Sequence, residues 1–211
     1  MPSEVHNRSR PKWSYIVLIV VIAGAVLGID QLSKLAIESQ MKIHETWEII
    51  PGLFNFFYVL NPGAAFSIGS GATWIFTIII SVVIVAIIWF APRIRSIPWA
   101  LMLAFLLGGT MGNLYDRLFR EPGFAIGHVV DFLQITFFPA IFNVADVFIV
   151  SSMCLFVLLT ILGLNIDGSR HKRPSANSEL DGEETVEETL AETVEATSED
   201  SSGAELSQEQ A

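Results

Sequence analysis

The sequence is poor in charge. Of its 211 residues only 16% are Asp, Glu, Lys or Arg and 52% are hydrophobic, whereas a soluble globular domain usually carries about 25% charged residues. An integral membrane protein is therefore expected. The net charge of −10 comes from the C-terminal end of the chain, because residues 179–211 hold twelve of the 22 acidic residues and no Lys or Arg. The rest of the chain carries twelve basic and ten acidic residues.

Cysteine and clustered histidine are also scarce. Cys154 is the single cysteine, which excludes an intramolecular disulfide. The four histidines are scattered, and no His/Cys group has the spacing of a metal site. No glycine pattern resembles a phosphate-binding loop, and the few basic residues do not form a nucleic-acid surface. These absences predict a protein without a metal, a cofactor or a nucleic-acid partner.

Four apolar runs are long enough to cross a bilayer, which takes about 20 helical residues. They predict transmembrane helices at about 14–37, 73–90, 98–118 and 143–164. The first run resembles the apolar part of a cleavable signal peptide. It is too long for one, however, and it continues into Asp30 without an Ala-x-Ala cleavage site.

The third run carries two further signals. Pro98 stands at its beginning, a favoured position for proline in a helix. Gly108, Gly109 and Gly112 follow inside it, and such small residues allow neighbouring helix backbones to approach closely. The third helix is therefore expected to pack tightly against others.

Basic residues predict the orientation. Segments 1–12, 91–97 and 165–173 carry three, two and three Lys/Arg, and the positive-inside rule places such segments in the cytoplasm. With four helices both termini are then cytoplasmic. The loops 38–72 and 119–141 are expected on the outer face.

The predicted fold is thus an all-α integral membrane protein of four transmembrane helices, with a small extracytoplasmic β-like segment between the first two. That segment is expected because residues 47–59 mix aromatic and β-branched residues around a Pro-Gly turn. The chain divides into a basic N-terminal segment 1–12, a membrane domain 13–165 and a cytoplasmic tail 166–211. From about residue 174 the tail is acidic and nearly free of large apolar residues, so disorder is expected.

The unusual polar residues of the membrane domain gather at the outer ends of the predicted helices and in the outer loops. They are Asp30, Asn61, Asn113, Asp116, Arg117, Asp131, Asn143 and Asp146. Ionisable groups at the edge of a bilayer core are costly and often functional. A site at this face would act on something extracytoplasmic.

Asp131 and Asp146 are the first candidates for chemistry. Two carboxylates that approach each other cannot both ionise easily, so one acid and one base coexist at neutral pH. Such a pair can activate water and protonate a leaving amine, which is peptide hydrolysis without a covalent intermediate. The structural alternative is that each caps a helix or pairs with an arginine. Asn143 is a good helix N-cap and lies three residues before Asp146, on the same helix face.

Two further groups have helical spacing. Asn113, Asp116 and Arg117 share one face, and Arg117 could hold a carboxylate, a backbone carbonyl or a lipid headgroup. An ion pair with Asp116 is the structural alternative. Asp30 and Lys34 could form one intrahelical pair at the outer interface, or Lys34 could extend to the interface with its partner.

Five motifs resemble those of signal peptidase II, the lipoprotein signal peptidase family of aspartic peptidases. They occur in the family's order and lie at residues 30–34 (DQLSK), 61–67 (NPGAAFS), 108–117 (GGTMGNLYDR), 129–132 (VVDF) and 142–146 (FNVAD). The resemblance covers about residues 13–165. Each motif alone is weak, whereas all five with four apolar runs are specific. The acidic tail lies outside the family's usual core.

The resemblance implies an endopeptidase that needs no cofactor. Its catalytic residues would be Asp131 and Asp146. The residues implied to support or line the site are Asp30, Lys34, Asn61, Gly63, Asn113, Arg117 and Asn143. The implied substrate is a diacylglyceryl-modified prolipoprotein, cut just before its lipidated cysteine. The implied setting is the bacterial cytoplasmic membrane, where a monomer contacts lipids and acts at the extracytoplasmic face.

Two other classes of function fit parts of the sequence. A small transporter or proton relay would use Asp and Arg residues near the bilayer, but it should carry charges through the depth of the membrane and show inverted repeats. A membrane scaffold would use the acidic tail to recruit a basic partner. It predicts that deletion of residues 174–211 removes function, whereas the peptidase prediction is that the shortened chain still cleaves.

Overall fold

The computed structural model describes residues 12–63 and 73–169. Its long helices confirm the prediction of four apolar helices able to cross a membrane. They are α1 (Lys12–Gln40), α2 (Thr73–Phe90), α3 (Ile97–Phe119) and α4 (Val144–Ile161), and a short 3₁₀ turn, η3 (Ala91–Arg93), follows α2. The acidic tail from residue 174 lies outside the described residues.

Local signals explain where these helices start and stop. Helix α2 ends just before Pro92, which lies inside η3. Helix α3 begins with a proline in its first turn, as the sequence predicts for Pro98. Asn143 is the N-cap of α4, which confirms the prediction for that residue.

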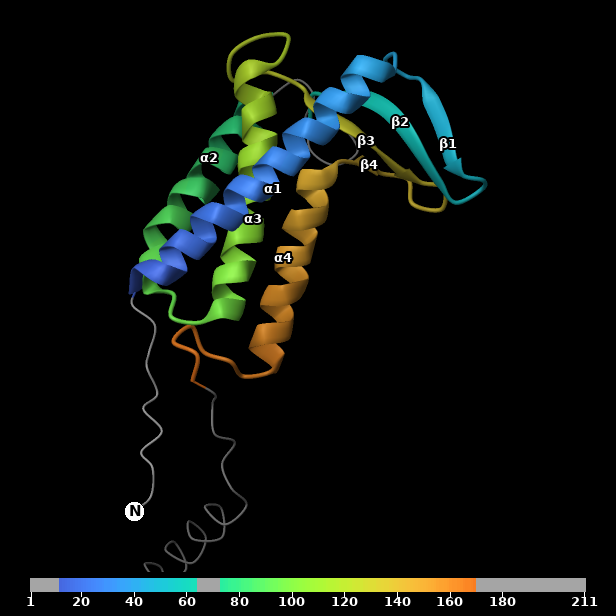
Figure 1. Cartoon of the computed structure of the whole chain (residues 1–211). Coiled ribbons are helices and arrows are strands. Elements are labelled where there is room, and N and C mark those ends of the chain that lie inside the picture. Colours follow the sequence, from blue (N-terminus) through green and yellow to red (C-terminus); the bar gives the residue numbers. More distant parts are fainter. Residues whose placement is uncertain (1–11, 64–72, 170–211) are drawn as a thin grey trace, which may run out of the picture. The chain divides into compact units, whose positions relative to one another are not determined.

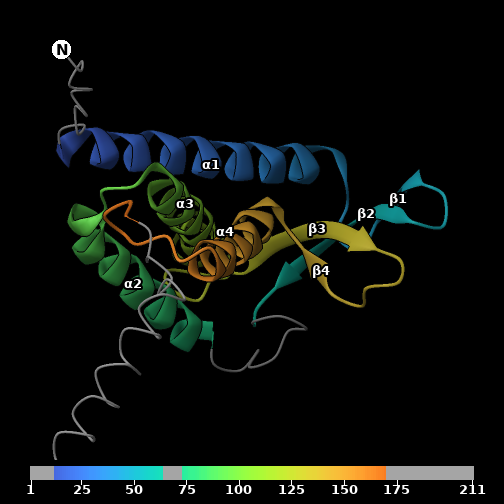
Figure 2. The same cartoon turned by 90° about the horizontal axis from the view of Figure 1, so that it is seen from below.

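Helix α3 is the central helix of the bundle and packs against α1, α2 and α4 (Figures 1 and 2). In its most apolar stretch 61% of residues are buried, against 17–22% in the other three helices. The glycines of α3 make this approach possible. A Cβ on Gly108 would lie 2.6 Å from the Val26 side chain in α1, and a Cβ on Gly109 would lie 2.6 Å from the Ala145 carbonyl in α4.

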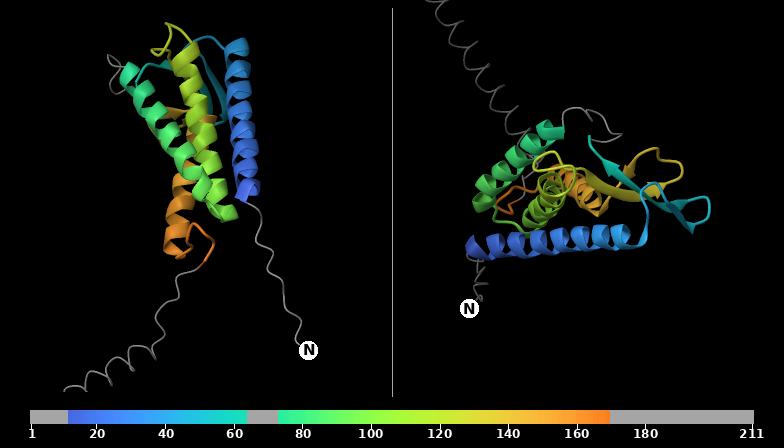
Figure 3. Two further views of the ribbon diagram at one scale, coloured as in Figure 1. Left: turned by 90° about the vertical axis from the view of Figure 1, so that its left-hand side faces the viewer. Right: turned by 90° about the horizontal axis from the view of Figure 1, so that it is seen from above.

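A four-stranded antiparallel sheet lies at the end of the bundle where α1 ends and α4 begins (Figures 1 and 3). Its strands follow in chain order: β1 (Thr46–Ile50), β2 (Phe54–Asn61), β3 (Val129–Ile135) and β4 (Ile141–Phe142). The β1–β2 turn contains Gly52 at φ +71°, a backbone conformation that glycine adopts without steric cost. Strands β1 and β2 lie in the segment where the sequence indicates β structure. Strands β3 and β4 lie in a segment predicted only as a loop.

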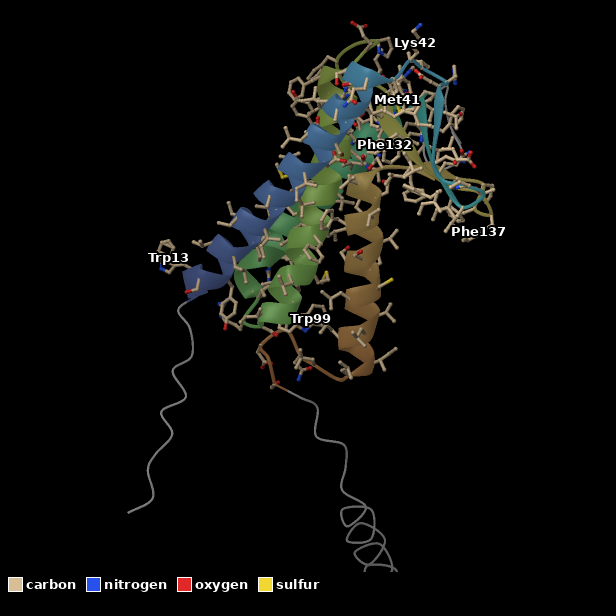
Figure 4. All side chains as sticks on the ribbon, turned by 45° about the vertical axis from the view of Figure 1, so that its right-hand side comes forward. Trp13, Met41, Lys42, Trp99, Phe132 and Phe137 are labelled. Carbon is tan, nitrogen blue, oxygen red and sulfur yellow. The ribbon has the colours of Figure 1, made fainter. Side chains whose placement is uncertain are left out.

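The buried apolar side chains form two clusters. The larger joins α1, α2, α3 and α4 through residues such as Ile19, Leu103 and Leu159. The smaller joins the end of α1 to the sheet through Tyr58 and Phe132. Figure 4 shows Trp99 at one end of the bundle and Phe132 at the other, where the sheet meets the helices. The sheet is thereby attached to the same end of α1, α3 and α4, and this is where the polar residues meet.

Candidate active site

The start of α4 holds Asp146 in a fixed position. The Asn143 side chain accepts the backbone N–H of Asp146 at 3.1 Å, and the Asp146 carboxylate accepts the backbone N–H of Asn143 at 3.1 Å. Such a reciprocal capping box satisfies two backbone donors that the helix leaves unpaired. Asp30 of α1 adds a third contact, because its Oδ1 accepts the N–H of Ala145 at 2.9 Å. Helix α4 therefore begins with Asp146 held against both its own cap and α1.

The sheet supplies the second carboxylate. Asp131 lies in β3 beside Val59 of β2 and is only 3% exposed. Its Oδ2 accepts a hydrogen bond from Asn61 Nδ2 at 2.8 Å, and its Oδ1 accepts one from Asn143 Nδ2 at 2.6 Å. Burial, together with the nearby charge of Asp146, raises the pKa of Asp131 to about 7 against the lowering effect of these two amides. Asp131 is thus a carboxyl group that can hold a proton near neutral pH.

Asn113 of α3 connects the two carboxylates to the rest of the bundle. Its Nδ2 donates to Asp146 Oδ1 at 2.9 Å, while its Oδ1 accepts from Asn143 Nδ2 at 3.2 Å. Each of the four carboxylate oxygens of Asp131 and Asp146 therefore accepts one N–H group. Among the residues that the structure describes, neither carboxylate forms a salt bridge. Two acids held by amides, with Asp131 buried and Asp146 partly exposed, can exchange protons with a bound substrate.

A second, fully buried cluster of charges lies between α1 and α3. Lys34 Nζ lies 2.8 Å from Asp30 Oδ2 and 2.7 Å from Asp116 Oδ2, and all three side chains are 0% exposed. The predicted Asp30–Lys34 pair is therefore present, with Asp116 as an additional partner. Gln31 Nε2 donates to both carboxylates. A Cβ on Gly112 would lie 3.0 Å from the Asp30 carboxyl carbon, so only glycine leaves room for this carboxylate.

Arg117 holds backbone carbonyls rather than a carboxylate. Its Nη1 donates to the carbonyls of Asn61, Pro62 and Gly127 at 3.0–3.3 Å, and its Nη2 donates to the carbonyl of Gly63. The Gly63 N–H in turn donates to Asn61 Oδ1 at 3.0 Å. This clamp keeps the end of β2 in place, and with it the amide that donates to Asp131. Of the alternatives open for Arg117, the backbone-carbonyl contact is the one observed.

The structure thus brings every predicted site residue to one end of the bundle. The sequence prediction did not name Gln31 and Arg120 as site residues, and it named Asp116 only as a possible partner of Arg117. Asp116 receives Arg120 Nε at 2.7 Å, and Arg120 also contacts Glu38. The spacing of Asp116 and Arg120, four residues apart on one helix, was the available signal. Within residues 12–63 and 73–169 no group of three His, Cys, Asp or Glu side chains could hold a metal ion.

An apolar cavity of about 540 Å³ opens beside Asp146. One wall is α4, through Asp146, Val147 and Val150, and the other is the β3–β4 turn with Phe137 and Phe138. Figure 4 shows Phe137 at the far tip of the sheet. A carboxylate at the edge of an apolar cavity can meet a substrate that is itself largely apolar.

The four apolar helices define a multi-pass helical membrane protein. A solved bacterial membrane enzyme, determined by the in meso method at 2.3 Å resolution, matches with a TM-score of 0.63 and 28% identity, over 74% of this chain and 94% of that chain.

Sequence relatives define the family. The family model of signal peptidase (SPase) II matches residues 21–162. The lipoprotein signal peptidase of Leifsonia xyli is 48% identical over 81% of this chain and 79% of that protein. The enzyme of the same name from Rhodococcus jostii is 42% identical over 72% and 77%. The chain belongs to the signal peptidase II family and is a peptidase.

Proposed function

We propose that this chain cleaves diacylglyceryl-modified prolipoproteins just before the lipidated cysteine, with Asp131 and Asp146 as the catalytic pair. Removal of signal peptides from prolipoproteins follows from its membership of the signal peptidase II family. The observation that carries the proposed mechanism is the convergence of Asp131 from β3 and Asp146 from α4 within one frame of asparagine amides. The transporter and scaffold alternatives have no comparable support.

The proposed chemistry needs one acid and one base. One carboxylate removes a proton from a water molecule as the water oxygen bonds to the scissile carbonyl carbon, and the other carboxyl group protonates the carbonyl oxygen. The C–N bond then breaks, and the proton taken from water passes to the cysteine nitrogen that leaves. The hydroxyl proton returns as the new carboxylic acid forms. No covalent intermediate with the protein is required.

The supporting residues keep this geometry. Asn61, Asn113 and Asn143 supply the side-chain amides that touch the carboxylates. Arg117 and the Gly63 backbone position Asn61. A frame in which each amide is held at its other end keeps the two acids close to the productive geometry.

The proposed setting is the bacterial cytoplasmic membrane, with the carboxylates at its extracytoplasmic face. Arg93 and Arg95 lie just before α3 begins, at the opposite end of that helix from Asn113 and Arg117. The positive-inside rule then assigns the arginine end to the cytoplasm. The apolar cavity beside Asp146 would receive part of a substrate that stays in the bilayer, and lipid burial contributes about 0.8 kcal/mol per methylene group. We propose that the enzyme acts as a monomer.

The test uses purified protein in detergent and a diacylglyceryl-modified prolipoprotein. Asp131→Asn and Asp146→Asn should each abolish cleavage while membrane insertion and thermal unfolding show a folded protein. Asp167→Asn is the matched control, because Asp167 lies in the turn after α4, away from the carboxylate pair, and it should cleave as the wild type does. Normal turnover by either dyad variant would refute the assignment.

A further inference from the structure

Lys34 is a buried cation with all of its donors engaged. An ammonium group has three N–H donors and no acceptor. Here the three partners are Asp30 Oδ2 at 2.8 Å, Asp116 Oδ2 at 2.7 Å and Asn113 Oδ1 at 3.2 Å. Because the ammonium group cannot accept a hydrogen bond, Lys34 can only donate one to Asn113.

This contact sets the orientation of the Asn113 amide. An asparagine side chain accepts at its oxygen and donates at its nitrogen. With Oδ1 turned to Lys34 and to Asn143 Nδ2, the Nδ2 of Asn113 points at Asp146 Oδ1, 2.9 Å away. If the Asn113 amide were reversed, its NH₂ group would face the donors of Lys34 and Asn143. Its carbonyl oxygen would then face the Asp146 carboxylate.

The amide orientation favours one charge state of Asp146. Both of its oxygens accept hydrogen bonds, one from Asn113 Nδ2 and one from the backbone N–H of Asn143. Hydrogen bonds donated to a carboxylate favour its ionised form. Asp131 accepts two N–H groups as well, but Asp146 also lies in the first turn of α4, where the helix dipole favours a negative charge. The charged groups that act on Asp146 are Lys34 and Asp30 of α1, and Asp146 in turn acts on Asp131 of β3.

We propose that Lys34 is a positioning residue for the cleavage reaction: through Asn113 it holds Asp146 as the proton acceptor and leaves Asp131 as the proton donor. This inference rests on the proposed function. In the reaction Asp146 then takes the water proton and passes it to the leaving nitrogen. Asp131 protonates the carbonyl oxygen and recovers its proton when the new carboxylic acid forms. The raised pKa of Asp131, about 7, suits the donor.

The test must remove the Lys34 donor without leaving an extra buried charge. In the double variant Lys34→Met/Asp116→Asn, one cation and one carboxylate disappear together, so the net charge of the cluster is unchanged. Because Asp116 Oδ2 also accepts the backbone N–H of Val130, beside Asp131, the single variant Asp116→Asn is measured in parallel and its effect is subtracted. Glu38→Gln is the matched control, because it removes another α1–α3 ion pair that does not touch Asn113.

We expect the double variant to fold and to lower kcat by roughly 10–100-fold, the range found when a group that orients a metal ligand is removed. KM should be unchanged, because the Lys34 side chain is 0% exposed and so out of reach of a bound substrate. The acid limb of the pH–rate profile should move to higher pH, since Asp146 would be ionised less readily. Glu38→Gln should change neither quantity.

A double-mutant cycle with Asn113→Ala separates positioning from general stabilisation. If Lys34 acts through Asn113, the double variant loses no further activity in the Asn113→Ala background. An additive loss there, or native kcat and pH profile in the double variant, would overturn the inference. Failure of the wild type to cleave the prolipoprotein would instead refute the proposed function.

Discussion

Replacement of Gly112 by alanine tests how tightly the site is packed. Gly112 lies in α3, where an added Cβ would lie 3.0 Å from the Asp30 carboxyl carbon and 3.3 Å from the Ala145 Cβ. Asp30 is 0% exposed and cannot turn away without losing Lys34 Nζ and the N–H of Ala145. The extra methyl group must therefore separate α1, α3 and α4 at the point where α4 begins.

The magnitude follows from two opposing effects. Overpacking a well-filled interior costs about 1–3 kcal/mol, whereas Gly→Ala within a helix gains about 0.5–1 kcal/mol. Gly28→Ala is the control, because Gly28 lies in α1 and an added Cβ would meet nothing within 4 Å. Gly28→Ala has the stabilising effect of Gly→Ala but no overpacking, so the free energies of unfolding of the two variants should differ by about 1–3 kcal/mol. For a chain of this size each kcal/mol shifts the unfolding midpoint by about 2–4 °C.

The assay pairs thermal unfolding in detergent with cleavage of the lipidated prolipoprotein. Gly112→Ala should unfold at a lower temperature than the wild type and cleave more slowly, because displacement of Asp30 releases the start of α4 and moves Asp146. Gly28→Ala should be as stable as the wild type or slightly more so, with normal cleavage. Equal stability and equal turnover in the two variants would refute the packing argument.

Three other predictions address the chemistry, the clamp and the cavity. Because the pKa of Asp131 is raised from 3.8 to about 7, cleavage should decline as pH rises above about 7 and the proton donor is lost. A pH–rate profile that stays flat to high pH would contradict this. Arg117→Lys replaces a planar fork that meets four carbonyls with a point donor, so kcat/KM should fall roughly 10–100-fold, whereas Arg93→Lys should leave it unchanged. Val150→Trp should fill the cavity beside Asp146 and raise KM, and Val157→Trp, similarly exposed on α4 but outside that cavity, should not.

Local patterns predicted those features that depend on neighbours in the chain. Apolar runs of sufficient length gave the four helices, and the Asn143–Asp146 spacing gave the cap of α4. The Asp30–Lys34 pair followed from a separation of one helical turn. Each depends on spacing that is visible along a single segment.

Contacts between segments far apart in the chain could not be predicted from such local patterns. Residues 129–135 lie within the predicted outer loop 119–141, yet they pair with β2 about 70 residues earlier. This pairing is what places Asp131 beside Asn61. Likewise Asp116 lies next to Lys34 only because Gly108 and Gly112 let α3 approach α1 closely.

The buried cluster of Lys34, Asp30 and Asp116 also has a consequence for biogenesis. Chains are made and inserted from the N-terminus, so α1 enters the membrane before Asp116 has been synthesised. Until α3 arrives, Lys34 and Asp30 have only each other as charged partners, and water must reach this end of α1. Assembly of α1 with α3 is thus the step that completes the ion pairs of Lys34.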